Sequence, residues 1–327
     1  MNTSRPRIEA VDVARGVALV AMGVYHFIWD LSFFEFIPMR IFFEPRVQYF
    51  GHIIAVSFLA LVGVSIALAA RGAFDIAAYL RRTALVAGAA ALVSIGTYFF
   101  MPDSFIAFGI LHCIVAASLL ALAFLRAPWF APLIAGALVA LAPLVLASQA
   151  FDNLNWILGL GVKEPRTLDW RPLFPWTGFA LIGLGAARFM LAQGVPERLA
   201  NWRAGNGVTR ALSFGGRHSL AVYILHQPVL LAIVFVASTA MTNFGSARAP
   251  ANEATQEFEF RSSCIEQCVA AGPERSFCQT ACDCVIRDAR NAGLWSQILR
   301  DNLASSERSR FDAITRACLR PDSNLIR

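Results

Sequence analysis

The chain has 327 residues, of which 57% are hydrophobic and only 15% are charged, and its net charge is +6. Its mean hydropathy is +0.56, whereas soluble domains carry about 25% charged residues. This composition excludes an ordinary soluble enzyme, a disordered chain and a collagen-like repeat. Residues 1–247 hold 17 basic and 11 acidic side chains, so they carry the whole excess of positive charge. Basic residues between apolar segments are typical of cytoplasmic loops, so we expect a lipid membrane and no nucleic acid as partner.

Apolar segments along the chain predict about seven transmembrane helices, because about 20 residues cross the hydrocarbon core of a bilayer. Residues 1–247 are therefore predicted to form an all-α polytopic membrane helix bundle, followed by a small disulfide-stapled helical C-terminal domain over residues 248–327. The first helix follows two arginines but contains ionisable residues and lacks a small-residue cleavage site, so we interpret it as retained and not as a secretory signal. The helices are expected near residues 11–31, 47–70, 83–101, 104–125, 129–149, 173–192 and 218–243.

The distribution of basic residues predicts the orientation. If the N-terminus is cytoplasmic, the inner segments hold eleven basic residues, Arg5 and Arg7 among them, and the outer loops hold five. This excess favours a cytoplasmic N-terminus. Seven spans then place the C-terminal tail outside, which is the periplasm in a bacterium.

The first predicted helix carries a stripe of four ionisable residues. At about 100° per residue they fall within roughly 60° of arc. Lipid does not tolerate such a stripe, so it must face the bundle interior or a wet cavity, where ionisable groups are usually functional. The alternative is two structural pairs at i, i+3 and i, i+4 spacing. The four residues are Asp12, Arg15, His26 and Asp30.

Further polar residues lie in or beside the other spans. Two histidines lie near the outer ends of the second and fourth helices, at a depth similar to His26. A third lies in the last helix and precedes Gln227 and Pro228. An aspartate lies where the long outer loop enters the sixth helix, and it either pairs with Arg171 or contacts a substrate. The candidate substrate-binding residues are His52, His112, Asp169 and His226.

Six of the seven cysteines lie in the tail, which suits an oxidising compartment. Two pairs have i, i+4 spacing on a helix face, and Gly272-Pro273 between them is typical of a turn. Two antiparallel helices would then be bridged twice, leaving a third bridge. The alternative is a cytoplasmic four-cysteine zinc site, but the spacing fits zinc ribbons poorly, so no metal is expected. The predicted disulfides are Cys264–Cys282, Cys268–Cys278 and Cys284–Cys318.

Residues 7–34, RIEAVDVARGVALVAMGVYHFIWDLSFF, carry Asp12, the pair Arg15-Gly16 and an Arg-x10-His spacing that ends at His26. This segment resembles the opening helix of integral membrane acyltransferases, and most closely the bacterial relatives of the heparan-alpha-glucosaminide N-acetyltransferase catalytic family. Three further segments agree with the resemblance, which covers about residues 7–245: FGILHCIVAASLL, DWRPLFPWTGFALIGLG and GRHSLAVYILHQPVL.

The resemblance implies an enzyme of the bacterial inner membrane. It would pass an acyl group, acetyl in the simplest case, from cytoplasmic acyl-CoA to a sugar amine or hydroxyl of a glycan or glycolipid outside. His26 would act as general base or carry the acyl group transiently. Arg15 would bind the phosphates of acetyl-CoA, and Asp30 would orient His26.

Two features depart from the larger members of these families. They have about ten or more helices, so a complete CoA cavity here is expected to need a dimer or to be shallow. The cysteine-rich tail has no counterpart in the family pattern, and it is a candidate surface for a homodimer or a larger membrane complex. A non-enzymatic alternative stays open: an integral membrane subunit, or a small-solute or proton carrier that uses the histidine stripe.

Overall fold

The computed structural model describes residues 8–34, 36–72, 74–195, 201–243, 253–299 and 305–319. Within these ranges every regular element is a helix, which confirms the predicted all-α class. The chain divides into two compact units, one formed by Met1–Ile28 with Arg46–Ala232 and the other by Trp29–Pro45 with Ile233–Arg327. The first unit contains most of the predicted spans, and the second contains the cysteine-rich helices.

Among the residues that the structure describes, five helices are long and apolar enough to cross a membrane, and two further apolar helices are shorter. These seven helices overlap the seven predicted segments, so the chain is a multi-pass membrane protein. The long helices are α1 (Glu9–Phe33), α2 (Pro45–Ala69), α3 (Ile76–Phe100), α7 (Leu173–Ala192) and α10 (Ser219–Asn243), and the shorter ones are α4 (Ile110–Leu122) and α5 (Phe130–Leu146).

Helix α4 begins six residues later than the expected start at residue 104. The chain first forms the 3-10 turn η2 (Pro102–Ser104). The following residues then pair with the segment before α7, through hydrogen bonds from the Leu168 amide to the Ser104 carbonyl (2.9 Å) and from the Arg171 amide to the Phe108 carbonyl (3.2 Å). The backbone of this stretch is therefore engaged outside any helix until α4 starts.

The loop between α5 and α7 is folded. It contains the 3-10 helix η3 (Gln149–Leu154) and the short helix α6 (Asn155–Leu158). Asn155 is 1% exposed. Its Oδ1 accepts from the Gly161 amide at 2.6 Å, and its Nδ2 donates to the Lys163 carbonyl at 2.6 Å. This buried amide holds the loop closed on itself.

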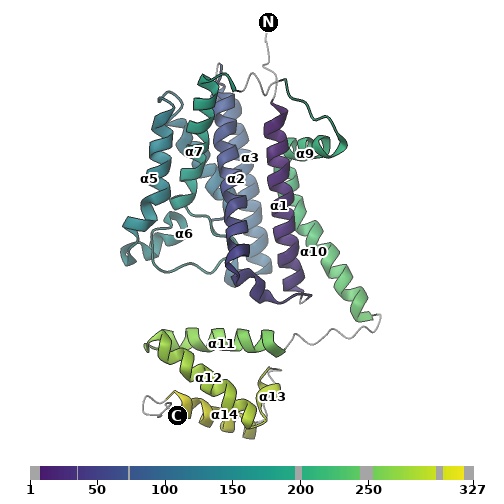
Figure 1. Ribbon diagram of the computed structural model, residues 1–327, viewed down its shortest axis with the longest axis vertical. Helices are drawn as coiled ribbons and strands as arrows, with labels where there is room; N and C mark the ends of the chain where they lie inside the picture. The colour runs from purple at the N-terminus through teal and green to yellow at the C-terminus, as the bar shows by residue number, and fades with distance from the viewer. Residues whose placement is uncertain are drawn as a thin grey trace. The chain divides into compact units, whose positions relative to one another are not determined.

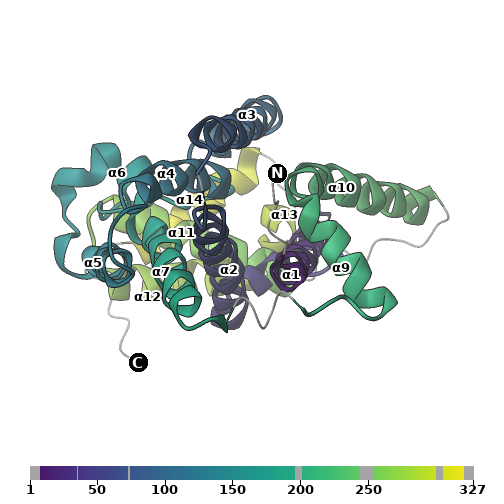
Figure 2. The same cartoon turned by 90° about the horizontal axis from the view of Figure 1, so that it is seen from above.

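Helix α7 packs closely between α5 and α2 (Figure 2). A Cβ added at Gly178 would lie 2.5 Å from the Gly136 carbonyl oxygen of α5, and one added at Gly183 would lie 2.3 Å from the Ala60 carbonyl oxygen of α2. Only glycine permits such approach of two backbones. Small residues at helix crossings are the usual way in which membrane helices associate.

A further helix of the first unit, like α6, lies outside the predicted spans. Helix α9 (Gly207–Arg217) begins at an N-cap where the Asn206 side chain accepts from the Thr209 amide at 2.8 Å. It lies across the direction of α1 (Figure 1). A Cβ at Gly216 would lie 1.8 Å from the Asp12 carbonyl oxygen. Helix α9 therefore contacts the backbone of α1 directly.

Where the structure describes it, the second unit holds four helices of the tail and the turn η1 (Met39–Phe43). Its three disulfides, Cys264–Cys282, Cys268–Cys278 and Cys284–Cys318, are the predicted pairs. Helical spacing favoured the first two, and the third joins the two cysteines left over. Because each of these sulfurs is bonded to another sulfur, none is a thiolate ligand for zinc. The helices are α11 (Glu253–Ala270), α12 (Arg275–Asn291), α13 (Trp295–Leu299) and α14 (Ser305–Cys318).

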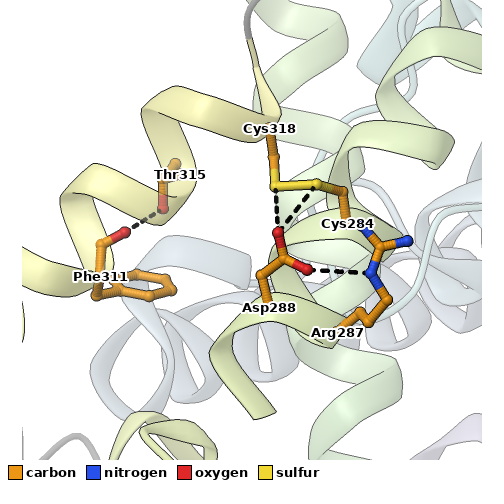
Figure 3. Close-up of a disulfide and its surroundings, with 6 residues drawn as sticks. All are labelled: Cys284, Arg287, Asp288, Phe311, Thr315 and Cys318. Carbon is orange, nitrogen blue, oxygen red and sulfur yellow. Dashed lines mark hydrogen bonds and ion pairs between the residues drawn. A yellow bond between two sulfur atoms is a disulfide. The ribbon is translucent and has the colours of Figure 1, made fainter. Parts of the chain in front are cut away.

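The Cys284–Cys318 disulfide joins α12 to α14 beside a carboxylate (Figure 3). Oδ2 of Asp288 lies 3.7 Å from both sulfur atoms, and its Oδ1 accepts from Arg287 at 3.0 Å. Both cysteines are buried against Val285, which is 1% exposed. The bridge is thus part of the core of this small helical unit, which suits a domain too small to be stable on apolar burial alone.

Candidate functional site

Two histidines of the first unit meet across α1 and α10. Nδ1 of His26 lies 3.3 Å from Nε2 of His226, and the two ring centroids are 4.9 Å apart. Nδ1 of His26 also lies 2.6 Å from Oε1 of Gln227. The sequence marked both histidines as candidates but did not place them together, because they are 200 residues apart.

His226 is held by its own helix. Its Nδ1 lies 2.6 Å from the carbonyl oxygen of Tyr223, one turn earlier in α10. The ring centroids of Tyr223 and His226 are 5.6 Å apart. His26, His226, Gln227 and Tyr223 therefore form one connected polar group inside the apolar helices, and we call these four residues the histidine cluster.

A small cavity joins the histidine cluster to the start of α4. Its volume is about 10 Å³, and its lining includes Tyr223, His112 and Asp169. A space of this size is at the lower limit for one water molecule. It connects residues of three segments that are far apart in the sequence, but it is much smaller than an acyl group or a sugar.

Asp169 caps α4 from a distant segment. Its Oδ2 accepts from the Ile110 amide at 2.7 Å, at a helix end that attracts negative charge. Its Oδ1 lies 3.8 Å from Nη1 of Arg171. A Cβ at Gly109 would lie 2.5 Å from the Asp169 carboxylate, which explains the glycine before α4. Of the two expected arrangements, the structure contains the Asp169–Arg171 pair, and the substrate contact stays a prediction.

His112 has partners on both ring nitrogens. Its Nδ1 accepts from the Gly109 amide at 3.3 Å, and its Nε2 lies 3.4 Å from Oγ of Ser94. Ser94 in turn donates to the Ile106 carbonyl at 2.6 Å. These contacts join α3 to the start of α4 and give His112 a structural task. Its expected role in binding substrate stays a prediction.

His52 belongs to an aromatic group beside the same loop. Its ring centroid is 5.5 Å from that of Trp176, and the Arg171 guanidinium lies 4.7 Å above the Trp176 ring. The loop before α7 contributes the charged pair Asp169 and Arg171 to this region, and the expected contact of His52 with substrate stays a prediction.

Arg15 lies in a separate cluster near the start of α1. Its Nη1 donates to Oδ1 of Asp12 at 2.9 Å, and its Nη2 donates to Ser65 of α2. Asp12 is 2% exposed, and its Oδ2 lies 3.6 Å from Arg217, which also lies 3.5 Å from Glu9. The Arg15 side chain is 15% exposed and that of Arg217 is 42% exposed. Arg217 is thus the more accessible cation of the cluster.

The two clusters lie at different levels of α1. Eleven residues separate Arg15 from His26, which is about 16 Å along a helix. Asp30 lies one turn beyond His26, and its side chain is fully buried. His26 contacts Gln227 and His226, and the orienting role expected of Asp30 stays a prediction.

The site predicted from the sequence does not include Gln227, Tyr223, Ser65 or Arg217. Gln227 carried one available signal, since it follows His226 directly in an apolar helix. The other three become visible only when α10, α2 and α9 are packed against their neighbours.

A model of the family described as heparan-alpha-glucosaminide N-acetyltransferase, catalytic, matches residues 7–228. The match covers 222 of the 327 residues and ends just beyond the histidine cluster. No curated protein and no solved structure matches the chain.

Proposed function

The chain belongs to the heparan-alpha-glucosaminide N-acetyltransferase catalytic family, and from this membership we propose that it transfers an acetyl group from acetyl-CoA to a sugar amine or hydroxyl. The family and the apolar helices make it a membrane acyltransferase. In this proposal acetyl-CoA binds from the cytoplasmic side, and the sugar acceptor binds from the outer side. The observation that carries it is the histidine cluster, which lies inside spanning helices and within the matched residues.

The proposed step is general-base catalysis by His26. The acceptor nitrogen or oxygen attacks the thioester carbonyl carbon while its proton passes to the imidazole of His26. The carbon–sulfur bond then breaks, and the CoA thiolate leaves and is protonated. Imidazole suits this task because it changes charge near neutral pH. Transient acetylation of His26 is the variant of this step that labelled protein would reveal.

The cluster around Asp12 supports a donor site for the CoA phosphates. Arg15 was expected to bind them, but its guanidinium is already engaged by Asp12 and Ser65. Arg217 shares Asp12 and is more exposed, so we propose that both arginines face the phosphates, with Arg217 the more accessible. A guanidinium binds phosphate through two parallel hydrogen bonds. The distance of about 16 Å along α1 to His26 is comparable to the pantetheine arm.

The proposal is tested by following release of free CoA thiol from acetyl-CoA with glucosamine as acceptor, using purified full-length protein in detergent. We expect His26→Ala to lower the rate by about 100-fold or more, since general bases contribute 10²–10⁴-fold. His218→Ala is the matched control, because His218 is exposed and follows α9, and it should keep the rate. Equal rates for wild type and His26→Ala would contradict the proposal.

A further inference from the structure

We propose that His226 and Gln227 are positioning residues that hold His26 in the tautomer with its proton on Nδ1, so that Nε2 carries the lone pair that acts as base. The inference rests on the proposed function for the role of His26. It adds two residues of α10 to the reaction, and it follows from which atoms are able to donate and which only accept.

The carbonyl oxygen of Tyr223 determines the tautomer of His226. This oxygen only accepts hydrogen bonds, and it lies 2.6 Å from Nδ1 of His226. Nδ1 of His226 must therefore carry a hydrogen. A neutral imidazole has a single N–H, so Nε2 of His226 is an acceptor. The backbone of α10 thus sets the tautomer of its own histidine.

His226 in turn determines the tautomer of His26. Nε2 of His226, an acceptor, lies 3.3 Å from Nδ1 of His26. Two lone pairs do not bond to each other, so Nδ1 of His26 is the donor and carries the hydrogen. Its ring then has the lone pair on Nε2.

Gln227 supplies a second acceptor for the same hydrogen. Its Oε1 lies 2.6 Å from Nδ1 of His26. A glutamine presents either a carbonyl or an NH₂ group, and only the carbonyl suits a donating Nδ1. The contact with His226 requires a donating Nδ1 on His26, and the Gln227 amide presents its carbonyl oxygen to that nitrogen. Two neighbouring residues of one helix point acceptors at one N–H.

This arrangement favours proton uptake at Nε2. When His26 takes a proton from the sugar amine or hydroxyl, it becomes an imidazolium. The Nδ1–H of this imidazolium faces two hydrogen-bond acceptors, His226 and Gln227. A carboxylate plays this part in serine hydrolases, where it fixes the tautomer and stabilises the cation. Inside a membrane a carboxylate is expensive to bury, whereas a neutral amide and a neutral imidazole do the same task without a second charge.

The direct test is nitrogen-15 NMR of the histidine rings in the full-length protein. The spectrum is recorded in detergent micelles at neutral pH without acetyl-CoA. The chain has only five histidines, and the spectrum of His26→Ala identifies the His26 signals by their loss. We expect the shifts of a protonated Nδ1 and an unprotonated Nε2. The opposite pattern in wild-type protein would overturn the proposal, and this outcome needs no variant other than the one used for assignment.

Variants of Gln227 and His226 test whether these two residues determine the tautomer of His26. Gln227→Leu combined with His226→Phe removes both acceptors, and we expect the His26 signals to become a mixture of tautomers and kcat to fall at least tenfold. Gln227→Glu keeps an acceptor and should keep the Nδ1–H tautomer. Gln193→Leu is the matched control, because Gln193 is exposed at the end of α7. A double variant that keeps the pure Nδ1–H tautomer would overturn the proposal.

The two proposals fail in different ways. If the wild-type tautomer is the expected one but His26→Ala still transfers acetyl groups, the base assignment fails and the positioning contacts stand. If transfer needs His26 but its proton lies on Nε2, the positioning role fails and the proposed function stands.

Discussion

Asp12 uses one carboxylate oxygen for each of two guanidinium groups. Oδ1 pairs with Arg15 at 2.9 Å and Oδ2 with Arg217 at 3.6 Å, and the Asp12 side chain is 2% exposed. A buried charge of this kind is costly to remove, because its partners remain behind without compensation. The carboxylate therefore joins α1 to α9 and holds Arg15 in place.

We expect Asp12→Asn to lower the free energy of unfolding by about 3 kcal/mol, since breaking a buried ion pair costs about 3–5 kcal/mol. Thermal unfolding of the purified protein in detergent measures the change. Asp103→Asn is the control: Asp103 is exposed in η2, and its substitution should stay within about 0.5 kcal/mol. Similar losses in the two variants would show that the Asp12 pairs add nothing to stability.

Much of the residue-level chemistry on α1 was predictable. The helical period places Asp12, Arg15 and His26 on one stripe, and the structural pairing of Asp12 with Arg15 was one of the two expected arrangements. The partner of His26 was not predictable, because Gln227 lies 201 residues away. Nothing in local periodicity states which residues of two distant helices meet.

Glycines set how closely the helices approach. In α9, Gly215 and Gly216 are neighbours with opposite surroundings. A Cβ at Gly216 would lie 1.8 Å from the Asp12 carbonyl oxygen of α1, whereas one at Gly215 has no atom within 4 Å. The pair is an internal comparison in which the residue type and helix are the same and only the neighbour differs.

Gly216→Ala is expected to force α9 away from α1 and to lower the free energy of unfolding by about 1–3 kcal/mol, as overpacking does. Gly215→Ala should leave stability unchanged or raise it by up to about 1 kcal/mol, because alanine favours helices over glycine. Thermal unfolding of the two variants side by side measures the difference in their stability. A stable Gly216→Ala protein would mean that the close contact between α1 and α9 is not required.

At the level of elements, composition predicted the long helices well because an apolar run of about 20 residues has few alternatives to a spanning helix. Two features of the helices were not predicted. The start of α4 depends on Asp169, a capping group 59 residues away from Ile110. Helix α9 is short and amphipathic, so it contains no apolar run, and the sequence predicts a loop there.

The whole molecule combines an apolar helical unit with a cysteine-rich helical unit. Six cysteines form three disulfides, while Cys113 lies buried in α4 and is free. Disulfides persist in oxidising compartments, and the excess of basic residues predicts a cytoplasmic N-terminus. Both arguments predict that the tail lies on the outer side. The pairing of four of the cysteines was predictable because two i, i+4 pairs on antiparallel helices have few ways to meet.

The orientation is tested with a membrane-impermeant maleimide on right-side-out vesicles. We expect the tail to be labelled only after treatment with an impermeant reductant, because its described cysteines are bridged. Cys113→Ser should give the same labelling, since Cys113 is 0% exposed. Labelling that requires permeabilised membranes would place the tail inside and contradict the predicted orientation.

The proposed function is that this membrane protein transfers an acetyl group from CoA to an acceptor, with His26 as the general base. The most direct measurement adds acetyl-CoA labelled in its acetyl group to the outside of inverted vesicles that contain wild-type protein or His26→Ala, with a sugar amine enclosed. The account predicts labelled acceptor inside vesicles of the wild type alone. Equal labelling in both would contradict the role of His26, and CoA that neither binds nor turns over would favour a carrier or a structural subunit.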